Sequence, residues 1–223
     1  MSLISIVLPA YNEAQAIGNV IQDIPLQIIK DLGYTYEIII IDGHSKDNTI
    51  AIAENNNARC YTSPRGYGRQ YKYGYSIAKG KYIISFDTDN SYDPKLIPQM
   101  LKLLNNEDYD FISIKRGFSS DNMRYLNILG NRFLTFIINI FFKLSLSDSQ
   151  SGMWGIRKSI LPNLKLLSNG MSFSEEIKIK AFQNFKALEL PGTYSKRTGT
   201  SKLNIIRDGL SNFLFLFMLL FKK

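Results

Sequence analysis

An apolar run that ends in two carboxylates constrains this chain more than any other feature of its sequence. Residues 83–86 are Ile-Ile-Ser-Phe, and Asp87, Thr88 and Asp89 follow directly. Such a run is typical of a buried strand in a parallel sheet, and open sheets of this kind bind ligands beyond the carboxyl ends of their strands. Two carboxylates in that loop supply the hard oxygen ligands that Mg²⁺ or Mn²⁺ prefers. We therefore expect a metal site at Asp87 and Asp89, with a diphosphate completing the coordination.

Two other interpretations of this loop compete with a metal site. The loop could be a polar turn before the helix that Asp93 and Pro94 begin. The alternating oxygen-bearing residues after Asp87 also resemble a calcium-binding loop. Such a loop requires Gly at its sharp turn and Glu at its last position, where this chain has Tyr92 and Pro98. The sequence excludes the calcium loop and leaves the polar turn open.

Strand and helix patterns alternate along the first half of the chain. Strands are predicted at residues 3–8, 36–41, 58–62, 83–86 and 110–115. After the first strand, Asn12 is expected to cap a helix whose apolar face includes Ile17 and Val20. Alternation this regular predicts an α/β fold with a mostly parallel sheet flanked by helices.

The glycine pattern excludes one large class of nucleotide-binding fold. The turn after the first strand, residues 9–13, contains no glycine, so the dinucleotide-binding fingerprint is absent. Gly66 and Gly68 lie in a later loop, where they would let the backbone approach a ligand or adopt a positive φ. We expect a flexible loop there, with phosphate contact as the alternative.

Positive charge is concentrated toward the C-terminus. The net charge is +8, and seven basic but only two acidic residues lie between 186 and 223. This balance indicates an anionic partner such as nucleotide phosphates, nucleic acid or anionic lipid. Nine apolar residues, 213–221, precede Lys222 and Lys223. At about 1.5 Å per residue they are too short for a ~30 Å hydrocarbon core, so we expect them at a membrane interface or docked on a neighbouring helix.

Three further features bear on location. Residues 125–146 are rich in Phe, Ile and Leu, and predict a helix that lies either in the core or on a membrane surface. The single cysteine, Cys60, fits the core of a protein in a reducing compartment. No basic and then apolar leader precedes Leu3, so we expect no signal peptide and a peripheral protein on the cytoplasmic face of the cell membrane.

Four motifs in sequence order resemble one family. They are Pro9-Ala10-Tyr11-Asn12-Glu13 after the first strand, Asp42 to Thr49 after the second, Asp87-Thr88-Asp89 after the fourth, and Arg197 to Lys202 near the end. In this order they resemble the inverting GT-A glycosyltransferases of family 2, specifically the dolichyl-phosphate (polyprenyl-phosphate) mannosyl- and glucosyltransferases. The resemblance covers about residues 3–205. We accordingly expect a GT-A catalytic domain over 1–203 and a membrane-interface helix over 204–223.

The resemblance implies roles for individual residues. The nucleotide-sugar donor would contact Pro9, Tyr11, Glu13, Asp42, Asp87, Thr88, Asp89, Arg197 and Lys202. The metal ion, Mg²⁺ or Mn²⁺, would bind Asp87 and Asp89. The catalytic residues would be Asp89, Arg116, Arg124 and Lys202, with both arginines facing the donor and lipid phosphates. Residues 151–155 would line the acceptor side. Gly43 and His44 stand after Asp42 where many relatives have an acidic residue, which leaves the nucleotide open.

These features predict transfer of a hexose from a nucleotide sugar to dolichyl or polyprenyl phosphate, with GDP-mannose favoured over UDP-glucose. A lipid phosphate is already an anion at neutral pH, so no strong general base is required, and arginines would bring the two anions together. The expected partners are thus the donor, the lipid phosphate and a membrane surface, without nucleic acid and with the oligomeric state open.

Two alternatives to this function stay open. A family 2 enzyme that acts on a sugar hydroxyl would need a carboxylate base, for which Glu175 or Glu176 could serve. A nucleic-acid-binding protein would explain the charge but would leave Asp87 and Asp89 without a role.

Overall fold

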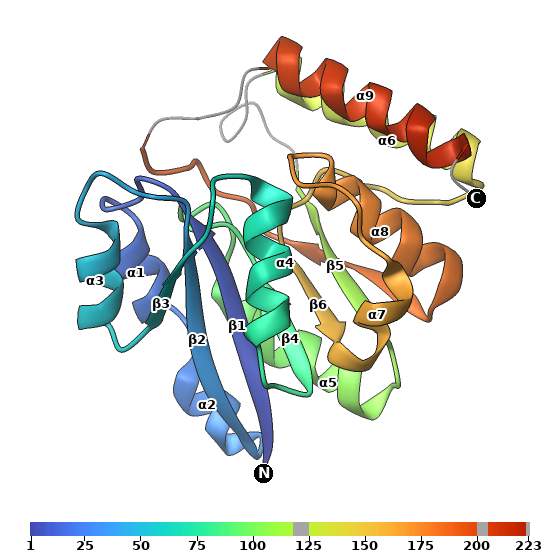
Figure 1. The fold of residues 1–223 in the computed structure, drawn as a ribbon. Helices are drawn as coiled ribbons and strands as arrows, with labels where there is room; N and C mark the ends of the chain where they lie inside the picture. Colours follow the sequence, from blue (N-terminus) through green and yellow to red (C-terminus); the bar gives the residue numbers. More distant parts are fainter. Residues whose placement is uncertain (118–124, 200–204, 222–223) are drawn as a thin grey trace.

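A seven-stranded sheet forms the centre of the computed structural model, which describes residues 1–117, 125–199 and 205–221 (Figure 1). The strands stand in the order β3-β2-β1-β4-β6-β5-β7. Their bounds are β1 Ser2–Ala10, β2 Tyr34–Asp42, β3 Arg59–Thr62, β4 Tyr82–Ser85, β5 Phe111–Arg116, β6 Trp154–Arg157 and β7 Ala187–Gly192. Neighbouring strands are parallel except where β6 pairs with β4 and β5. The predicted α/β fold with a mostly parallel sheet is confirmed.

Helices cover both faces of this sheet (Figure 1). One face carries α1 Ile17–Gln22, α2 Leu26–Asp31, α3 Thr49–Asn55 and α5 Ile97–Asn106. The other carries α4 Tyr67–Ile77, α7 Leu161–Leu164 and α8 Phe173–Asn184. Two 3-10 turns, η1 Pro94–Leu96 and η2 Lys158–Ile160, precede α5 and α7. The remaining helices, α6 Tyr125–Phe142 and α9 Ile205–Phe221, lie side by side outside these layers.

Side chains of the central strands alternate between two buried layers. In β1, Ile6 and Leu8 belong to the cluster under α1, α2 and α5, whereas Val7 packs in the cluster under α4 and α8. Successive side chains of a strand point to opposite faces, so a strand covered on both sides needs apolar residues at every position. This burial explains the continuous apolar runs in the sequence.

The turn after β1 differs from our prediction. Asn12 was expected to cap the next helix, but α1 begins at Ile17 and has no side-chain cap. Instead, Asn12 has a φ of 53°, and its Oδ1 accepts a hydrogen bond of 2.8 Å from the backbone N–H of Lys46. Its own backbone N–H donates to Ser45 Oγ. The prediction was wrong because Asn12 joins the loops after β1 and β2 rather than the start of a helix.

Gly74 lets α4 lie close against the sheet. A Cβ atom at this position would overlap Val7 Cγ1 and would lie 3.1 Å from Ile41 Cγ1. We expect Gly74→Ala to lower the free energy of unfolding by about 1–3 kcal/mol, as overpacking of a filled core does. Thermal unfolding measures this change. Gly130→Ala in α6 is the matched control, because a Cβ there meets open space; equal melting temperatures of the two variants would contradict the close contact.

The C-terminal helix docks on α6 through one of its faces. The described part of the predicted segment 204–223 is helical, and Leu216 of α9 packs with Ile138 and Phe142 of α6. By length and composition α6 could cross a membrane, and 11% of that segment is buried. The helix pair thus contributes a small core of its own beside α8.

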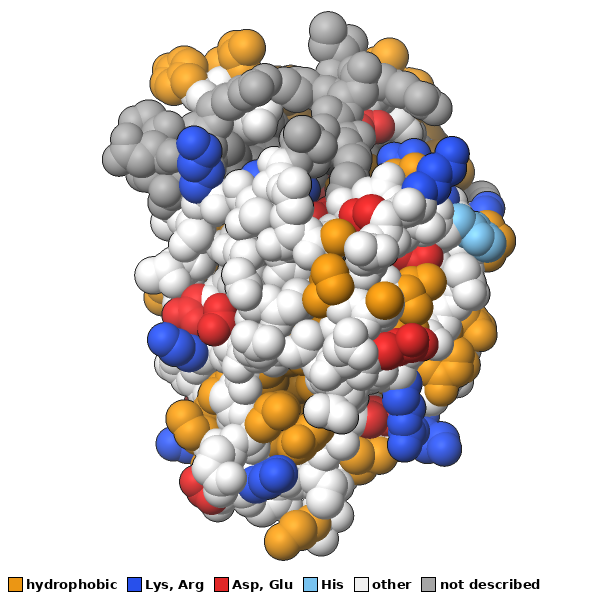
Figure 2. Space-filling view, turned by 90° about the vertical axis from the view of Figure 1, so that its left-hand side faces the viewer, with side chains coloured by type: hydrophobic (Ala, Val, Ile, Leu, Met, Phe, Trp, Pro, Cys, Tyr) orange, Lys and Arg blue, Asp and Glu red, His pale blue; other side chains and the backbone are white. Residues whose placement is uncertain are grey.

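The outer faces of this helix pair are apolar and exposed. The exposed residues are Tyr125, Leu126, Leu129, Phe133, Phe136, Ile140 and Phe141 in α6, and Leu210, Leu214, Phe217, Met218 and Phe221 in α9. Seen from the α3 side, hydrophobic side chains lie at the end of the molecule that the pair occupies (Figure 2). Docking and exposure, which the sequence presented as alternatives, occur on different faces of the same helices.

Candidate active site

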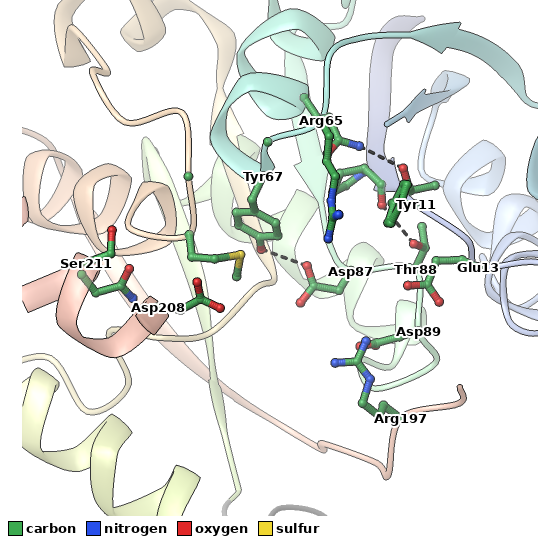
Figure 3. A pocket seen from close by; sticks show the side chains of 17 residues that line it. Tyr11, Glu13, Arg65, Tyr67, Asp87, Thr88, Asp89, Arg197, Asp208 and Ser211 are labelled. Carbon is green, nitrogen blue, oxygen red and sulfur yellow. Dashed lines mark hydrogen bonds and ion pairs between the residues drawn. The ribbon is translucent and has the colours of Figure 1, made fainter. Parts of the chain in front are cut away.

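A pocket of about 600 Å³ opens at the carboxyl ends of β1 and β4 (Figure 3). The chain runs outward from β1 to β3 and returns to the other side of β1 with β4, so the pocket lies where the strand order reverses. It is lined by Pro9, Ala10, Tyr11, Glu13, Arg65, Gly66, Tyr67, Gln70, Asp87, Thr88, Asp89, Gly170, Met171, Arg197, Asp208, Ser211 and Asn212. The structure therefore brings together the polar residues that follow β1 and β4, Arg197 near the end of the chain, and the first turns of α9.

Asp87 is held from two sides. The Tyr67 hydroxyl donates a hydrogen bond of 2.9 Å to Asp87 Oδ1, and Gly152 lies so close that a Cβ there would overlap Oδ2. Burial and the Asp89 carboxylate raise the pKa of Asp87 to about 7, although Tyr67 and Arg197 act in the opposite direction. Two carboxylates in a buried site are therefore costly unless a cation neutralises them.

Asp89 connects the loop after β4 to Arg197. Its Oδ2 lies 3.1 Å from Arg197 Nη2, and its backbone carbonyl accepts a hydrogen bond from the backbone N–H of Thr198. The other carboxylate oxygen accepts hydrogen bonds from the backbone N–H and the hydroxyl of Ser91. The Asp89 side chain is thereby fixed in one orientation beside Asp87.

The donor atoms at this place fit a hard divalent ion. Carboxylate oxygens are the ligands that Mg²⁺ and Mn²⁺ prefer, and Mg²⁺ is commonly held by one or two carboxylates together with substrate phosphates. Within residues 1–117, 125–199 and 205–221, no third Asp, Glu, His or Cys joins Asp87 and Asp89 in a metal-binding group. The residues present would hold an ion whose remaining ligands are phosphate or water oxygens.

The floor of the pocket is tied together by side chains that bond to backbone carbonyls. Thr88 Oγ1 donates to the carbonyl of Pro9 at 3.0 Å. Gln70 Nε2 donates to the carbonyls of Ala10 and Ile41, at 3.0 and 2.8 Å, which joins α4 to the ends of β1 and β2. Gln70 could not be predicted from the sequence, because nothing in its local pattern indicates partners on two distant strands.

Arg65 and the glycine loop form another side of the pocket. The Arg65 guanidinium lies 4.1 Å from the centre of the Tyr11 ring (Figure 3). No feature of the sequence predicted this contact. Gly66 has a φ of 154°, and a Cβ at Gly68 would lie 2.5 Å from the carbonyl oxygen of Ser168. These glycines let the start of α4 approach the segment at Ser168 and Asn169 closely, and Gly66 also lines the pocket. Contact of this loop with a phosphate stays a prediction.

Several predicted site residues do not line this pocket. Asp42 is buried at the end of β2, where its carboxylate accepts hydrogen bonds from the backbone N–H and hydroxyl of Ser45. Glu175 and Glu176 are fully buried in α8. Arg124 and Lys202 lie outside the described residues.

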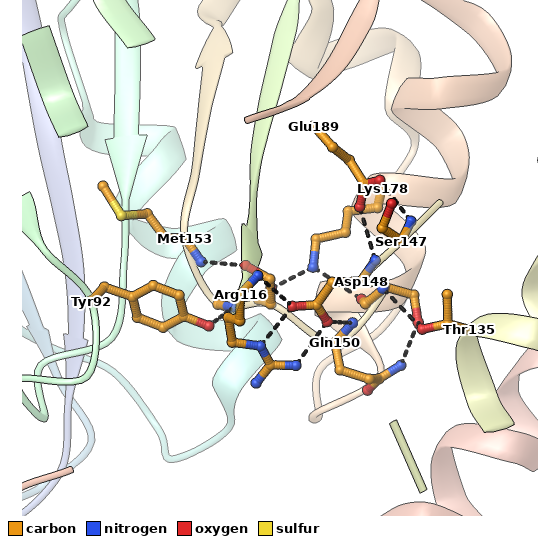
Figure 4. Close-up of polar contacts among 12 residues, drawn as sticks. Tyr92, Arg116, Thr135, Ser147, Asp148, Gln150, Met153, Lys178 and Glu189 are labelled. Carbon is orange, nitrogen blue, oxygen red and sulfur yellow. Dashed lines mark hydrogen bonds and ion pairs between the residues drawn. The ribbon is translucent and has the colours of Figure 1, made fainter. Parts of the chain in front are cut away.

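Arg116 lies in a buried ion pair next to the pocket (Figure 4). Its Nε and Nη2 donate to the two carboxylate oxygens of Asp148 at 2.7 and 2.8 Å, and its side chain is 6% exposed. The guanidinium also lies 5.2 Å from the centre of the Tyr194 ring. Buried arginines need such a carboxylate partner, and Asp148 supplies it here. The expected contact of Arg116 with phosphates stays a prediction.

The Asp148 ion pair belongs to a network that fixes the segment leading into β6 (Figure 4). Lys178 of α8 donates to the carbonyls of Ser149 and Ser151, and burial lowers the pKa of Lys178 to about 7, with partial compensation by Asp148. At the end of the segment, the backbone N–H of Gly152 donates to the Tyr92 hydroxyl. The network therefore determines where Gly152 meets Asp87.

Residues 5–164 match the family named glycosyl transferase family 2. The chain belongs to this family. A low-salt glycan biosynthesis hexosyltransferase of Haloferax volcanii, Agl6, is 29% identical over 212 residues, which is 92% of this chain but 51% of that protein. A dolichyl-phosphate hexose transferase of the same organism is 28% identical over 211 residues, which is 92% of this chain and 89% of the relative. This glycosyltransferase thus spans about half of the first relative and most of the second.

Solved structures confirm the GT-A fold of this family 2 glycosyltransferase. Glucosyl-3-phosphoglycerate synthase from Mycobacterium tuberculosis, in complex with Mn²⁺, UDP-glucose and phosphoglyceric acid, superposes with a TM-score of 0.78 at 19% identity. The match covers 98% of this chain and 80% of the synthase. The glycosyltransferase therefore has the sheet and helix arrangement that its motifs predicted.

Tyr67→Phe tests how the glycosyltransferase holds Asp87. In the wild-type protein the hydrogen bond from Tyr67 to Asp87 Oδ1 favours the ionised carboxylate, and the variant loses this bond. We expect about a tenfold weaker affinity for Mn²⁺ near neutral pH, as loss of a hydrogen bond to a charged group predicts. Calorimetric titration of Mn²⁺ in the presence of UDP measures the effect. Tyr73→Phe is the control, because Tyr73 lies on the exposed side of α4; equal losses in the two variants would contradict the role of Tyr67.

Proposed function

We propose that this glycosyltransferase moves a hexose from a nucleotide sugar to a dolichyl or polyprenyl phosphate at a membrane surface. One observation carries the proposal. The pocket that holds Asp87 and Asp89 is bounded by α9, and the opposite face of α9 is apolar and exposed. A water-soluble donor and an acceptor anchored in lipid could meet there. The relative named dolichyl-phosphate hexose transferase supports this acceptor.

In the proposed reaction the donor diphosphate lies beside Asp87 and Asp89. A divalent ion, when bound, would supply positive charge to stabilise the departing nucleoside diphosphate. Arg197 is next to this position, and its Nε is buried without a hydrogen-bond partner among the described residues. A phosphate oxygen would satisfy that donor.

The acceptor phosphate would attack the anomeric carbon of the hexose from the side opposite the diphosphate. A new C–O bond forms as the bond to the diphosphate oxygen breaks, so the configuration is inverted. The acceptor is already an anion at neutral pH and requires no base to remove a proton. Glu175 and Glu176 are fully buried in α8 and are not among the residues that line the pocket, which supports this choice over an acceptor hydroxyl that depends on either carboxylate.

A donor panel tests the proposed function. The protein is incubated with Mn²⁺, dolichyl phosphate and labelled GDP-mannose, UDP-glucose or UDP-galactose. We favour GDP-mannose from the sequence motifs, and the UDP-glucose complex of the synthase with the same fold supports including UDP-glucose. Labelled lipid from one of these donors is the expected result. Label that reaches only water-soluble sugar acceptors would contradict the lipid acceptor.

Membrane attachment is tested on the exposed face of α9. Leu214 and Phe217 are 59% and 37% exposed, and we expect the double change Leu214→Ser with Phe217→Ser to weaken liposome binding about a hundredfold or more, at ~1.5–3 kcal/mol for each buried side chain. Flotation with anionic liposomes measures the binding. Ile28→Ser in α2, where Ile28 is 52% exposed, is the control. Equal flotation of the double variant and the control would exclude this face of α9 as the anchor. Attachment to the cytoplasmic face of the membrane stays a prediction.

A further inference from the structure

We propose that the first turns of α9 form the wall of the pocket that recognises the hexose of the donor. Asp208, Ser211 and Asn212 are the α9 residues that line the pocket. Their spacing of three and four residues places them on one face of the helix. A carboxylate, a hydroxyl and an amide are groups that exchange hydrogen bonds with sugar hydroxyls. The inference rests on the proposed function, because it assigns the sugar end of the same pocket.

The order of groups along the pocket matches the order of parts in a nucleotide sugar. Figure 3 shows Asp208 with Ser211 at one end, Asp87 between, and Tyr11 on the opposite side, with Asp89 below Tyr11. In a nucleotide sugar the diphosphate lies between the nucleoside and the hexose. With the diphosphate at the carboxylate pair and the nucleoside at the aromatic end near β1, the hexose extends toward α9.

Asn212 provides independent evidence for a ligand at this end. Its side chain is 7% exposed, it lines the pocket, and its Oδ1 has no hydrogen-bond partner among the described residues. A buried polar atom without a partner is destabilising and uncommon in folded proteins. Glu175 of α8 lies beside Asn212, and an amide that contacts Glu175 through one end keeps its other end for a ligand. A sugar hydroxyl would satisfy that group.

The position of this wall is set by the docking of α9. Leu216 and Leu219, one and two turns after Asn212, are buried in the cluster with Ile138 of α6 and Ile179 of α8. The apolar contacts fix the helix, so its polar first turns face the pocket in a defined orientation. A helix held in this way can discriminate between hexoses that differ in the direction of one hydroxyl.

Binding measurements separate the hexose from the rest of the donor. Asp208→Asn and Asn212→Ala are titrated, with Mn²⁺ present, against UDP-glucose and GDP-mannose and against UDP and GDP alone. We expect the affinity for the nucleotide sugar to fall about tenfold in each variant, with less than a twofold change for the nucleoside diphosphate. Asp208→Asn replaces a charge-assisted hydrogen bond with a weaker neutral one, and Asn212→Ala removes a hydrogen bond in a buried site. Asp31→Asn, an exposed carboxylate at the end of α2, is the matched control and should change neither affinity.

Two outcomes would overturn the inference. Equal losses for the nucleotide sugar and the nucleoside diphosphate would place Asp208 and Asn212 at another part of the donor, and unchanged affinities would remove them from the site. Ser211→Ala, at an exposed position, repeats the test should the buried Asn212 variant fail to fold. A wild-type protein that transfers no hexose to lipid phosphate but shows the expected difference in binding would contradict the proposed acceptor and support the hexose wall.

Discussion

Replacing Asp89 with asparagine is expected to lower turnover by about a thousandfold, because the amide removes a charge from the proposed metal site and cannot pair with Arg197. The shape of the side chain is kept, and asparagine can still accept the hydrogen bond from the Ser91 backbone. Arg197 is 28% exposed and can reach water, so we expect the melting temperature to fall by only a few degrees. Turnover and thermal unfolding are measured on the same preparation.

Asp93→Asn is the control for this substitution. Asp93 lies four residues further along, where its Oδ1 accepts a hydrogen bond of 3.0 Å from the backbone N–H of Lys95, and asparagine is an equally good cap. We expect near-normal turnover in this variant. Activity that survives removal of Mg²⁺ and Mn²⁺ by a chelator, or an Asp89→Asn enzyme with more than a tenth of normal turnover, would contradict the metal site.

The second large effect is expected at Gly152, which precedes β6. A Cβ at this position would overlap Asp87 Oδ2 and lie 2.8 Å from Asp87 Cγ. In Gly152→Ala either Asp87 turns away from the pocket or the segment before β6 moves, and both changes separate the two carboxylates. A displacement of about 1 Å in a catalytic group can cost a hundredfold in rate, and we expect at least that loss. Turnover with saturating donor and Mn²⁺ measures it.

Gly130→Ala provides the comparison, because the same change in α6 meets open space. A second measurement distinguishes a local effect from unfolding. The Gly152→Ala protein should retain a cooperative thermal transition while its affinity for Mn²⁺ falls in parallel with turnover. Normal turnover in this variant would show that the space beside Asp87 is wider than the structure indicates.

The strand-end residues could be predicted because local chemistry determines where they lie. An apolar run specifies a buried strand, and polar residues that follow it lie at the carboxyl edge, which is how Asp87, Asp89 and the turn after β1 were found. Gly152 lies at the same edge but precedes its strand, because β6 runs antiparallel to β4 and β5. The rule that binding residues follow their strands therefore does not predict the contact of Gly152 with Asp87.

Residues whose roles depend on distant partners were not predictable from the sequence. Arg116 is the last residue of β5, yet its guanidinium is paired with Asp148, and no local pattern selects that partner among 19 acidic residues. The first turns of α9 were overlooked for a different reason. The nine apolar residues 213–221 dominate that segment, and no local pattern marks Asp208 and Asn212 as binding residues. Only the position of the helix beside the pocket shows that they line it.

The two halves of the sheet differ in how far apart along the chain their strands lie. β1 to β4 come from residues 2–85 and form one half, whereas β5 pairs with β7 from residues 187–192. Domains grow from the N-terminus during synthesis, and pairing of distant segments is slow because long loops must close. We therefore expect the half with Asp87 and Asp89 to form on the ribosome well before Arg197 emerges. During that interval the two carboxylates stand at the ends of exposed strands, and Arg197, Asp208, Ser211 and Asn212 complete the site around them later.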